Sequence, residues 1–280
     1  MFHYLFRILQ KNNEMKTIRT ILFSIFIFYG CDMFESHPYD AYVRGEKNIN
    51  FTQIEEIEDK LEYSKTFRFA FISDTQRWYD ETKDFVRHIN QFSDIDFVIH
   101  GGDISDFGAT HEFIMQRDIL SELRMPYVAL LGNHDCLGTG EDVYKEIWGS
   151  PNFCFQSGNV LFVCLNTNAL EYDYSEPVPN FEFLEQILTN LPESVKRTIF
   201  VMHAPPFDKV FNNNVVKVFQ LYLNSFPNLM FCINGHCHRL EINELFDDGI
   251  VYYQVPNIEK RTYFVFTITE DGYDYEINYF

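Results

Sequence analysis

The chain has 280 residues, of which 46% are apolar and 18% aromatic, and this is enough for one large globular domain with a sizeable core. Its 30 Phe and 17 Tyr against 10 Pro and 13 Gly exclude a disordered, collagen-like or low-complexity chain. The formal net charge is −19 and no basic run stands out, so binding to a nucleic-acid duplex is not expected. An acidic protein that handles phosphate needs local positive charge, and bound metal ions are the obvious source.

Residues 1–31 differ in character from the rest of the chain. A short positive segment with Lys16 and Arg19 precedes the apolar residues 21–29, and Gly30-Cys31 follows, which is the layout of a cleaved export signal. The apolar run is shorter than the roughly 20 residues that cross a bilayer. The four residues ending at Cys31 resemble a bacterial lipobox. We therefore expect export to the cell envelope with a lipid anchor on Cys31 as the only membrane attachment. The alternative is an apolar N-terminal strand or helix, with residues 1–14 an over-extended start.

Residues 32–66 form a polar lead-in in which Ile54, Ile57 and Leu61 share one helical face. The predicted functional domain, residues 67–280, begins by alternating short apolar runs with amphipathic stretches. The apolar runs predict strands buried on both faces, at residues 67–73, 96–101, 126–132, 160–166, 198–203 and 229–234. Apolar residues at three- and four-residue spacing predict helices over residues 81–92, 111–123, 181–191 and 215–226. This alternation predicts an α/β layered fold.

The C-terminal tail follows a different pattern. Residues 249–255, 263–268 and 273–279 alternate apolar with polar side chains around the turn Glu270-Asp271-Gly272, so we expect antiparallel strands there. The cysteines after Cys31 contain no CxxC pair and are irregularly spaced, which indicates neither a disulfide scaffold nor a zinc knuckle. Cys164 and Cys232 lie inside apolar runs and are expected to be buried free thiols.

Five of the predicted strands end in polar residues of metal-ligand type. In chain order these clusters are Ser73-Asp74-Thr75-Gln76, Gly102-Asp103-Ile104-Ser105-Asp106, Gly132-Asn133-His134-Asp135, Met202-His203-Ala204-Pro205 and Gly235-His236-Cys237-His238. Ligands of open α/β sheets bind beyond the carboxyl ends of strands, so the clusters should converge on one crevice. Each cluster alone is typical of a turn or a helix cap. Together their carboxylates, imidazoles and amide oxygens suit two divalent metal ions better than one.

This ordered series resembles the calcineurin-like metallophosphoesterase superfamily, whose blocks are DxH, GDxxD, GNH(D/E), a lone His and GHxH. The resemblance covers about residues 67–240. It implies an α/β fold, a four-layer αββα sandwich of two mixed β-sheets flanked by helices, with a dinuclear metal site at the loops between the sheets. It also implies that the antiparallel tail completes the second sheet.

The resemblance assigns the metal ligands by position. They form two groups that share one carboxylate: Asp74, Gln76 and His238 for the first ion, Asn133, His203 and His236 for the second, and Asp103 for both. His134 would protonate the leaving oxygen as general acid, and Asp106 would orient it. Gln76 stands where the family most often has His. Because an amide oxygen is a poorer donor than imidazole, the first site should favour harder metals such as Mn²⁺.

The expected activity is hydrolysis of a phosphoric ester by a hydroxide shared between two divalent ions, Mn, Fe or Zn. The ions would keep the site positive inside an acidic chain, and the expected partner is a small phosphorylated substrate. Two alternatives remain: a hydrolase of pyrophosphate bonds in nucleotides, and a catalytically silent metal- or ligand-binding lipoprotein. Arg77, Trp78 and Tyr79 either form a rim with one cation and two stacking faces or belong to a solvated turn.

Overall fold

The structure is a computed structural model that describes residues 40–280. The predicted export signal and its lipobox-like end at Cys31 lie outside the described residues. Residues 40–280 belong to one compact unit. Within residues 40–280, no helix combines the length and the apolar character needed to cross a membrane.

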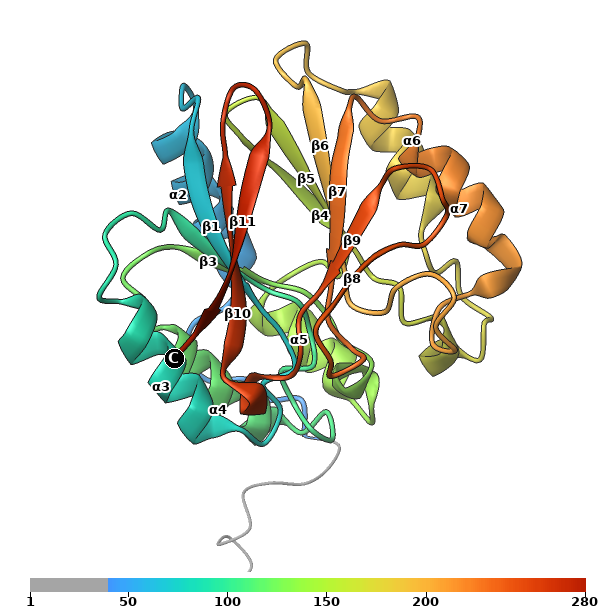
Figure 1. Cartoon of the computed structure of the whole chain (residues 1–280). Coiled ribbons are helices and arrows are strands. Elements are labelled where there is room, and N and C mark those ends of the chain that lie inside the picture. Colours follow the sequence, from blue (N-terminus) through green and yellow to red (C-terminus); the bar gives the residue numbers. More distant parts are fainter. Residues whose placement is uncertain (1–39) are drawn as a thin grey trace, which may run out of the picture. The chain divides into compact units, whose positions relative to one another are not determined.

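Two mixed β-sheets form the centre of this unit (Figure 1). The first sheet has the order β11-β10-β1-β2-β3 and consists of β1 (Phe67–Ile72), β2 (Phe97–His100), β3 (Tyr127–Ala129), β10 (Thr262–Ile268) and β11 (Tyr273–Tyr279). The second has the order β4-β5-β6-β7-β9-β8 and consists of β4 (Phe153–Ser157), β5 (Val160–Leu165), β6 (Arg197–Met202), β7 (Leu229–Asn234), β8 (Glu241–Glu244) and β9 (Val251–Gln254). Strands β1, β2 and β3 are parallel, as are β5, β6, β7 and β9.

Helices cover the outer face of each sheet. Helices α3 (Tyr79–Ile89), α4 (Thr110–Leu120) and α5 (Gly140–Ile147) pack on the first sheet, and α6 (Phe181–Thr189) and α7 (Val216–Leu223) pack on the second. Helix α3 shows why such segments are helical, because acidic residues occupy its first turn and basic residues its last, and its apolar residues face the sheet. The four layers enclose three hydrophobic clusters, one under each helical layer and one between the sheets. The predicted αββα sandwich is therefore confirmed.

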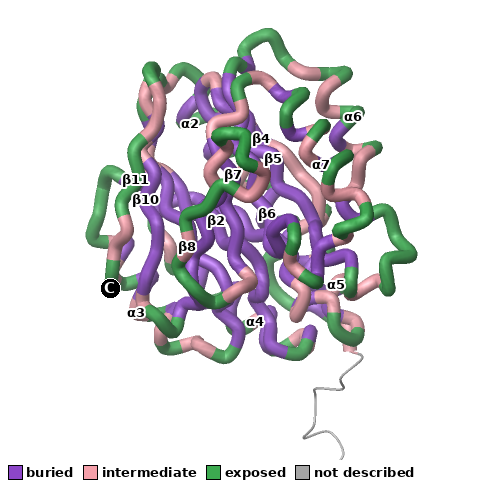
Figure 2. Tube along the Cα trace, turned by 45° about the vertical axis from the view of Figure 1, so that its right-hand side comes forward, coloured by how far each residue is buried: buried purple, intermediate pink, exposed green. Residues whose placement is uncertain are grey.

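The sequence of β1 explains how one strand serves two clusters. Successive side chains of a strand point to opposite faces. Phe67, Phe69 and Phe71 enter the cluster between the sheets, whereas Ala70 and Ile72 face the helices. The ring of Phe69 packs edge-on against Phe162 of the other sheet, with 5.3 Å between centroids. Figure 2 shows the resulting burial along the central strands.

The C-terminal tail differs from the prediction. Strands β10 and β11 extend the first sheet, where β10 pairs antiparallel with β1, so the expectation that the antiparallel tail completes the second sheet is wrong for them. Of the three predicted tail strands only β9 joins the second sheet, where it runs parallel to β7 and antiparallel to β8. Period-two alternation predicts a strand with two unlike faces, but it does not say which neighbour the strand pairs with. The structure settles this: β10 pairs with β1, so that Phe264 and Phe266 pack between the sheets, and Tyr263 and Val265 pack under the helices of the first sheet.

Helix α2 (Ile49–Leu61) lies in the predicted lead-in and protects the edges of both sheets. Strands β3 and β4 are edge strands, and each has backbone groups without a strand partner on one side. The side-chain amide of Asn50 exchanges two hydrogen bonds of 2.9 Å with the backbone of Ala129 in β3. The carboxylate of Glu58 accepts the backbone N–H of Gln156 in β4 at 2.8 Å. These contacts block further strand pairing at both edges.

Candidate dinuclear metal site

The five polar clusters meet where their strands end, and the backbone there is unusually tight. A Cβ atom on Gly132 would overlap the backbone nitrogen and the carboxylate of Asp103, so only glycine allows this approach. Four predicted ligands adopt left-handed backbone conformations, with φ of 57° at Asp74, 58° at Asp103, 73° at His236 and 54° at His238. Such conformations are costly for residues with a Cβ and concentrate at functional sites.

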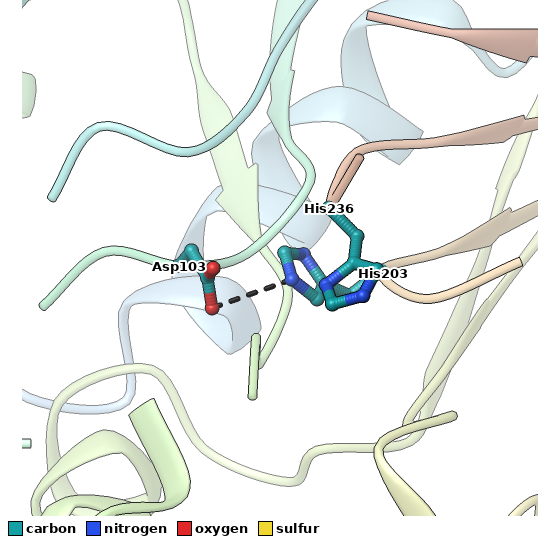
Figure 3. Close-up of side chains that lie close together, drawn as sticks. All are labelled: Asp103, His203 and His236. Carbon is teal, nitrogen blue, oxygen red and sulfur yellow. Dashed lines mark ion pairs between the residues drawn. The ribbon is translucent and has the colours of Figure 1, made fainter. Parts of the chain in front are cut away.

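Two of the ligands predicted for the second ion, His203 and His236, lie on one side of the Asp103 carboxylate (Figure 3). Nε2 of His203 lies 3.3 Å from Oδ1 of Asp103 and 3.2 Å from Oδ1 of Asn133. Nδ1 of His236 lies 2.9 Å from the same Asn133 oxygen. His203 is fully buried and Asp103 is 1% exposed. Four potential ligand atoms from four separate loops are therefore linked by contacts of 2.9 to 3.3 Å.

The residues predicted for the first ion share Asp103 with this group. The carboxylates of Asp74 and Asp103 and the imidazole of His238 form a second cluster of potential ligand atoms. Asp74 is fully buried and its Oδ2 accepts the backbone N–H of His236 at 3.0 Å. Among residues 40–280, Oδ1 of Asp74 accepts no well-directed hydrogen bond, although Nε2 of His238 lies 3.1 Å away. The half-exposed His238 leaves this part of the site open to solvent.

Gln76 also lies at the centre of the site. The end of its side chain is 3.1 Å from the carbonyl oxygen and 3.2 Å from Oδ2 of Asp103. With its NH₂ group toward Asp103, the amide donates to both oxygens. With its oxygen toward Asp103, three oxygens face one another, and only a cation would make this arrangement favourable. Gln76 is therefore placed either to bind the first metal or to hold Asp103.

The electrostatics of the site call for positive charge. Burial disfavours the charged form of His203, but the Asp103 carboxylate more than offsets this and raises the pKa of His203 to about 10. Burial also favours protonation of Asp74, yet His238 and His203 hold the pKa of its carboxyl well below its usual range. Two buried carboxylates thus depend on the charge of neighbouring imidazoles, and divalent cations would supply that charge instead.

The spacing of these atoms fits metal binding. Ligand atoms about 2.1 Å from one cation and at right angles to each other lie roughly 3.0 Å apart. The contacts among Asp103, Asn133, His203 and His236 span 2.9 to 3.3 Å. Nδ1 of His203 lies 2.8 Å from the carbonyl oxygen of Gly101, to which it donates, so the Nε2 lone pair faces the site in the neutral ring. The donor set fits two divalent ions that share Asp103.

His134 lies beside this centre and is not part of it. Its backbone N–H donates to Oδ1 of Asp103 at 2.9 Å, and its side chain is 34% exposed. Its Nδ1 lies 2.8 Å from the backbone carbonyl of Asp106 and 3.7 Å from the Asp106 carboxylate. Asp106 thus contacts His134 mainly through its main chain, while its carboxylate pairs with the half-exposed Arg77. Trp78 and Tyr79 pack against the outer cluster of the first sheet, so of the three proposed rim residues Arg77 is the one that contacts a site residue.

Two buried residues that support the loops were given no role by the sequence. Asp135 accepts hydrogen bonds from the backbone of Ile104, Ser105 and Gly132, which ties the second cluster to the third. Burial and the charge of Asp103 raise the pKa of Asp135 to about 7. His100 ends β2, and burial lowers its pKa to about 4. Its Nδ1 accepts the N–H of Gly102 at 3.2 Å, so its Nε2 donates to Thr75 at 2.8 Å.

Other polar residues near the strand ends have structural contacts. The Asn168 amide donates to the Leu131 carbonyl at 2.9 Å, and the Thr167 hydroxyl accepts the N–H of Ala204 at 3.1 Å. Both contacts brace loops that carry ligands. Cys164 and Cys232 are buried free thiols, as predicted. The sequence alone does not reveal the supporting roles of Asn168 and Thr167, because the hydrogen-bond partner of each lies far along the chain.

An αββα sandwich whose loops bring two ligand groups onto one shared carboxylate defines a class of dimetal hydrolases. The chain belongs to the calcineurin-like phosphoesterase family, whose profile matches residues 67–240. Members of this family depend on two metal ions.

Individual relatives are distant. A protein described as a 3',5'-cyclic-nucleotide phosphodiesterase from Nostoc sp. is 25% identical over 154 residues, which are 52% of this chain and 57% of the relative. The chain therefore matches little more than half of that protein's length. A dimetal phosphatase from Danio rerio shares the fold with a TM-score of 0.56 and 13% identity, over 76% of this chain and 98% of that one. The structure of GAP50, the anchor in the inner membrane complex of Plasmodium, has the same TM-score of 0.56 and 13% identity, over 77% of this chain and 85% of that one.

Proposed function

We propose that the protein hydrolyses a small phosphoric ester at a centre of two divalent cations. Asp74, Gln76 and His238 would hold the first, Asn133, His203 and His236 the second, and Asp103 both. The observation that carries this proposal is the position of Asp103, which belongs to both clusters of potential ligand atoms. When bound, the two cations would activate a water molecule for attack on phosphorus and neutralise charge on the phosphoryl oxygens.

His134 is the proposed general acid. Nδ1–H donates to the Asp106 carbonyl, which leaves Nε2 of the partly exposed ring to carry a proton to the leaving oxygen. Because the backbone N–H of His134 is bound to Asp103, the ring stays at the edge of the centre. Arg77 pairs with the carboxylate of Asp106 and places a cation on the same edge.

Two observations favour an ester that carries an apolar or aromatic group. Phe107, Leu137 and Phe207 are large exposed apolar side chains on the loops that carry Asp106, His134 and His203. The Nostoc relative is described as a cyclic-nucleotide phosphodiesterase. We therefore propose nucleotide phosphodiesters as the second candidate substrate class, ahead of pyrophosphate bonds.

A substrate panel tests both proposals. Purified protein with Mn²⁺ is assayed against aliphatic phosphomonoesters, aryl phosphomonoesters, cyclic nucleotides and dinucleotides with a pyrophosphate bond, and Asp103→Asn serves as the matched control. Hydrolysis of any ester by the wild type alone supports the proposed function, and the highest kcat/KM identifies the substrate class. Absence of hydrolysis across the panel by protein carrying two metal ions would instead support a silent metal-binding protein.

A further inference from the structure

Asp208 contacts a proposed metal ligand, and neither its sequence context nor the family motif assigns it a role. It lies five residues after His203, in the loop between β6 and α7. Its Oδ1 is 3.0 Å from Nε2 of His236. Both side chains are largely shielded, with 21% of Asp208 and 13% of His236 exposed. This contact is therefore far more shielded than a surface ion pair such as Lys65–Glu270, whose side chains are 73% and 59% exposed.

The loop itself determines where Asp208 lies. Oδ1 of Asp208 also accepts the backbone N–H of Val210 at 2.7 Å. Its backbone N–H donates to the carbonyl of Pro205 at 3.2 Å, and its carbonyl accepts the Asn213 amide at 2.7 Å. Asn213 also accepts the N–H of Phe207 at 2.9 Å. The carboxylate is thus placed by four local hydrogen bonds before it meets His236.

The contact determines the orientation of the His236 ring. A carboxylate only accepts hydrogen bonds, so Nε2 of His236 is the protonated nitrogen. Nδ1 then presents a lone pair toward Oδ1 of Asn133, which is another acceptor only 2.9 Å away. Two acceptors at this distance are stabilised by a cation between them. His203 shows a related arrangement in which the ring nitrogens exchange roles: its Nδ1 donates to the carbonyl of Gly101, and its Nε2 faces the site.

We propose that Asp208 is a positioning residue for the second metal ion, and that it holds His236 in the Nε2–H tautomer with Nδ1 directed at the ion. The inference rests on the proposed metal centre. A carboxylate behind a metal-bound imidazole makes the ligating nitrogen more basic and fixes the ring, and loss of such a partner typically costs about 10- to 100-fold in metal affinity. The neutral carbonyl of Gly101 increases the basicity of His203 less than a carboxylate would. Of the two hydrogen-bond partners behind these imidazoles, Asp208 should therefore matter more for metal affinity.

Calorimetric titration of the metal-free protein with Mn²⁺ measures this dependence. Asp208→Ala should lower the affinity for the second Mn²⁺ equivalent by about 10- to 100-fold and leave the affinity for the first nearly unchanged. Asp208→Asn should weaken it less, because the amide oxygen still accepts from Nε2. The matched control is Asp247→Asn, which removes one charge from an exposed turn at φ of 53°, where Asn is well tolerated. It should bind both equivalents as the wild type does.

A second measurement separates positioning from a purely structural role. In the Zn²⁺-loaded protein, ¹⁵N NMR of the histidines should show His236 protonated at Nε2, and Asp208→Ala should broaden or shift only this resonance among the ligands. An unchanged affinity for the second ion together with an unchanged His236 signal would overturn the inference. A lower melting temperature of the metal-free variant with unchanged metal affinity would also overturn it, since that is what a structural contact predicts. If the wild type itself binds fewer than two ions, the proposed function fails first.

Discussion

Asp103 illustrates how one residue can organise the whole site. Its carboxylate is almost completely buried, contacts His203 and accepts the backbone N–H of His134. Its main-chain oxygen accepts the N–H groups of Thr75 and Gln76, at 3.0 and 3.1 Å. The residue thus joins the first, third and fourth clusters. A buried carboxylate with this many imidazole and amide neighbours is stable only when positive charge lies close by.

The role of His134 is tested by its substitution with Asn. As a general acid it should contribute about 10²- to 10⁴-fold, so His134→Asn should lower kcat by that factor while metal content is unchanged. This factor corresponds to roughly 3 to 5 kcal/mol of transition-state stabilisation. The loss should be smaller with p-nitrophenyl esters, because p-nitrophenolate leaves readily without a proton.

Steady-state kinetics with good and poor leaving groups, together with metal analysis, measure this effect. Asp106→Asn is the comparison variant. It should give a smaller loss, because the 2.8 Å contact to His134 comes from the main chain and survives the substitution. Loss of metal from His134→Asn, or equal slowing of both kinds of ester, would show that His134 is a ligand or a phosphate-binding group.

Gln76 offers a test of the first metal site. If its oxygen binds the metal, Gln76→His should tighten the first site and shift the metal preference from Mn²⁺ toward Zn²⁺, which suits imidazole. Competition binding with the two ions measures this preference. If its NH₂ group instead holds Asp103, as the 3.1 and 3.2 Å contacts allow, the metal preference should not change. That outcome would place Gln76 outside the ligand set.

At the scale of the elements, the sequence predicts the parallel strands best. Five of the six residues of β1 are apolar and they lie on both of its faces, which is the pattern of a strand covered on two sides. The ligand clusters are also predictable, because carboxylates and imidazoles at consecutive strand ends have few structural explanations. Pairing partners are not predictable in this way. Strand β10 is buried on both faces, and its membership of the first sheet follows only from the packing of Tyr263 and Val265 under the helices of that sheet.

The supporting residues escaped prediction for a related reason. Asp208 and His236 are 28 residues apart in sequence, and nothing at either position announces a 3.0 Å contact. Helix α2 has a modest apolar stripe that predicts a helix, but its polar residues carry the edge contacts to β3 and β4. From sequence alone, a polar residue is predicted to lie in solvent unless its hydrogen-bond partner is known.

Helix α2 gives a prediction about stability. Asn50 is buried and makes two hydrogen bonds with Ala129, so Asn50→Ala should leave the backbone N–H of Ala129 without a partner, while its carbonyl keeps the Tyr144 hydroxyl. The expected loss is about 1 to 3 kcal/mol in the free energy of unfolding, measured by urea denaturation. Glu55→Ala on the exposed face of the same helix should change stability by less than about 0.5 kcal/mol. Equal stability of the two variants would contradict the edge-protecting role.

At the scale of the whole molecule, charge and function must be reconciled. The net charge of −19 disfavours the approach of a negatively charged phosphate ester. Two divalent ions at the ends of the strands would create a local positive potential at the site of the reaction. Arg77 adds a further cation beside it. Removal of the metals with a chelator should therefore abolish both catalysis and phosphate binding.

The N-terminal segment supplies a prediction about cellular location. We propose that the protein is exported and lipid-anchored at Cys31, on the basis of the sequence of residues 1–31 alone. Intact-mass analysis of membrane-extracted protein should then show loss of residues 1–30 and addition of acyl chains. Cys31→Ala should release the protein from the membrane fraction. Recovery of an unprocessed N-terminus from the cytosol would rule out this proposal.

The bridging role of Asp103 is the central claim, and metal stoichiometry measured beside activity tests it most directly. Wild-type protein should contain two equivalents of divalent metal per chain when fully active, because the two ligand groups share one carboxylate. Asp103→Asn should lose both equivalents together and all hydrolysis, while remaining folded by circular dichroism. Full activity with one equivalent or none, or an Asp103→Asn variant that keeps both ions, would contradict the dinuclear centre.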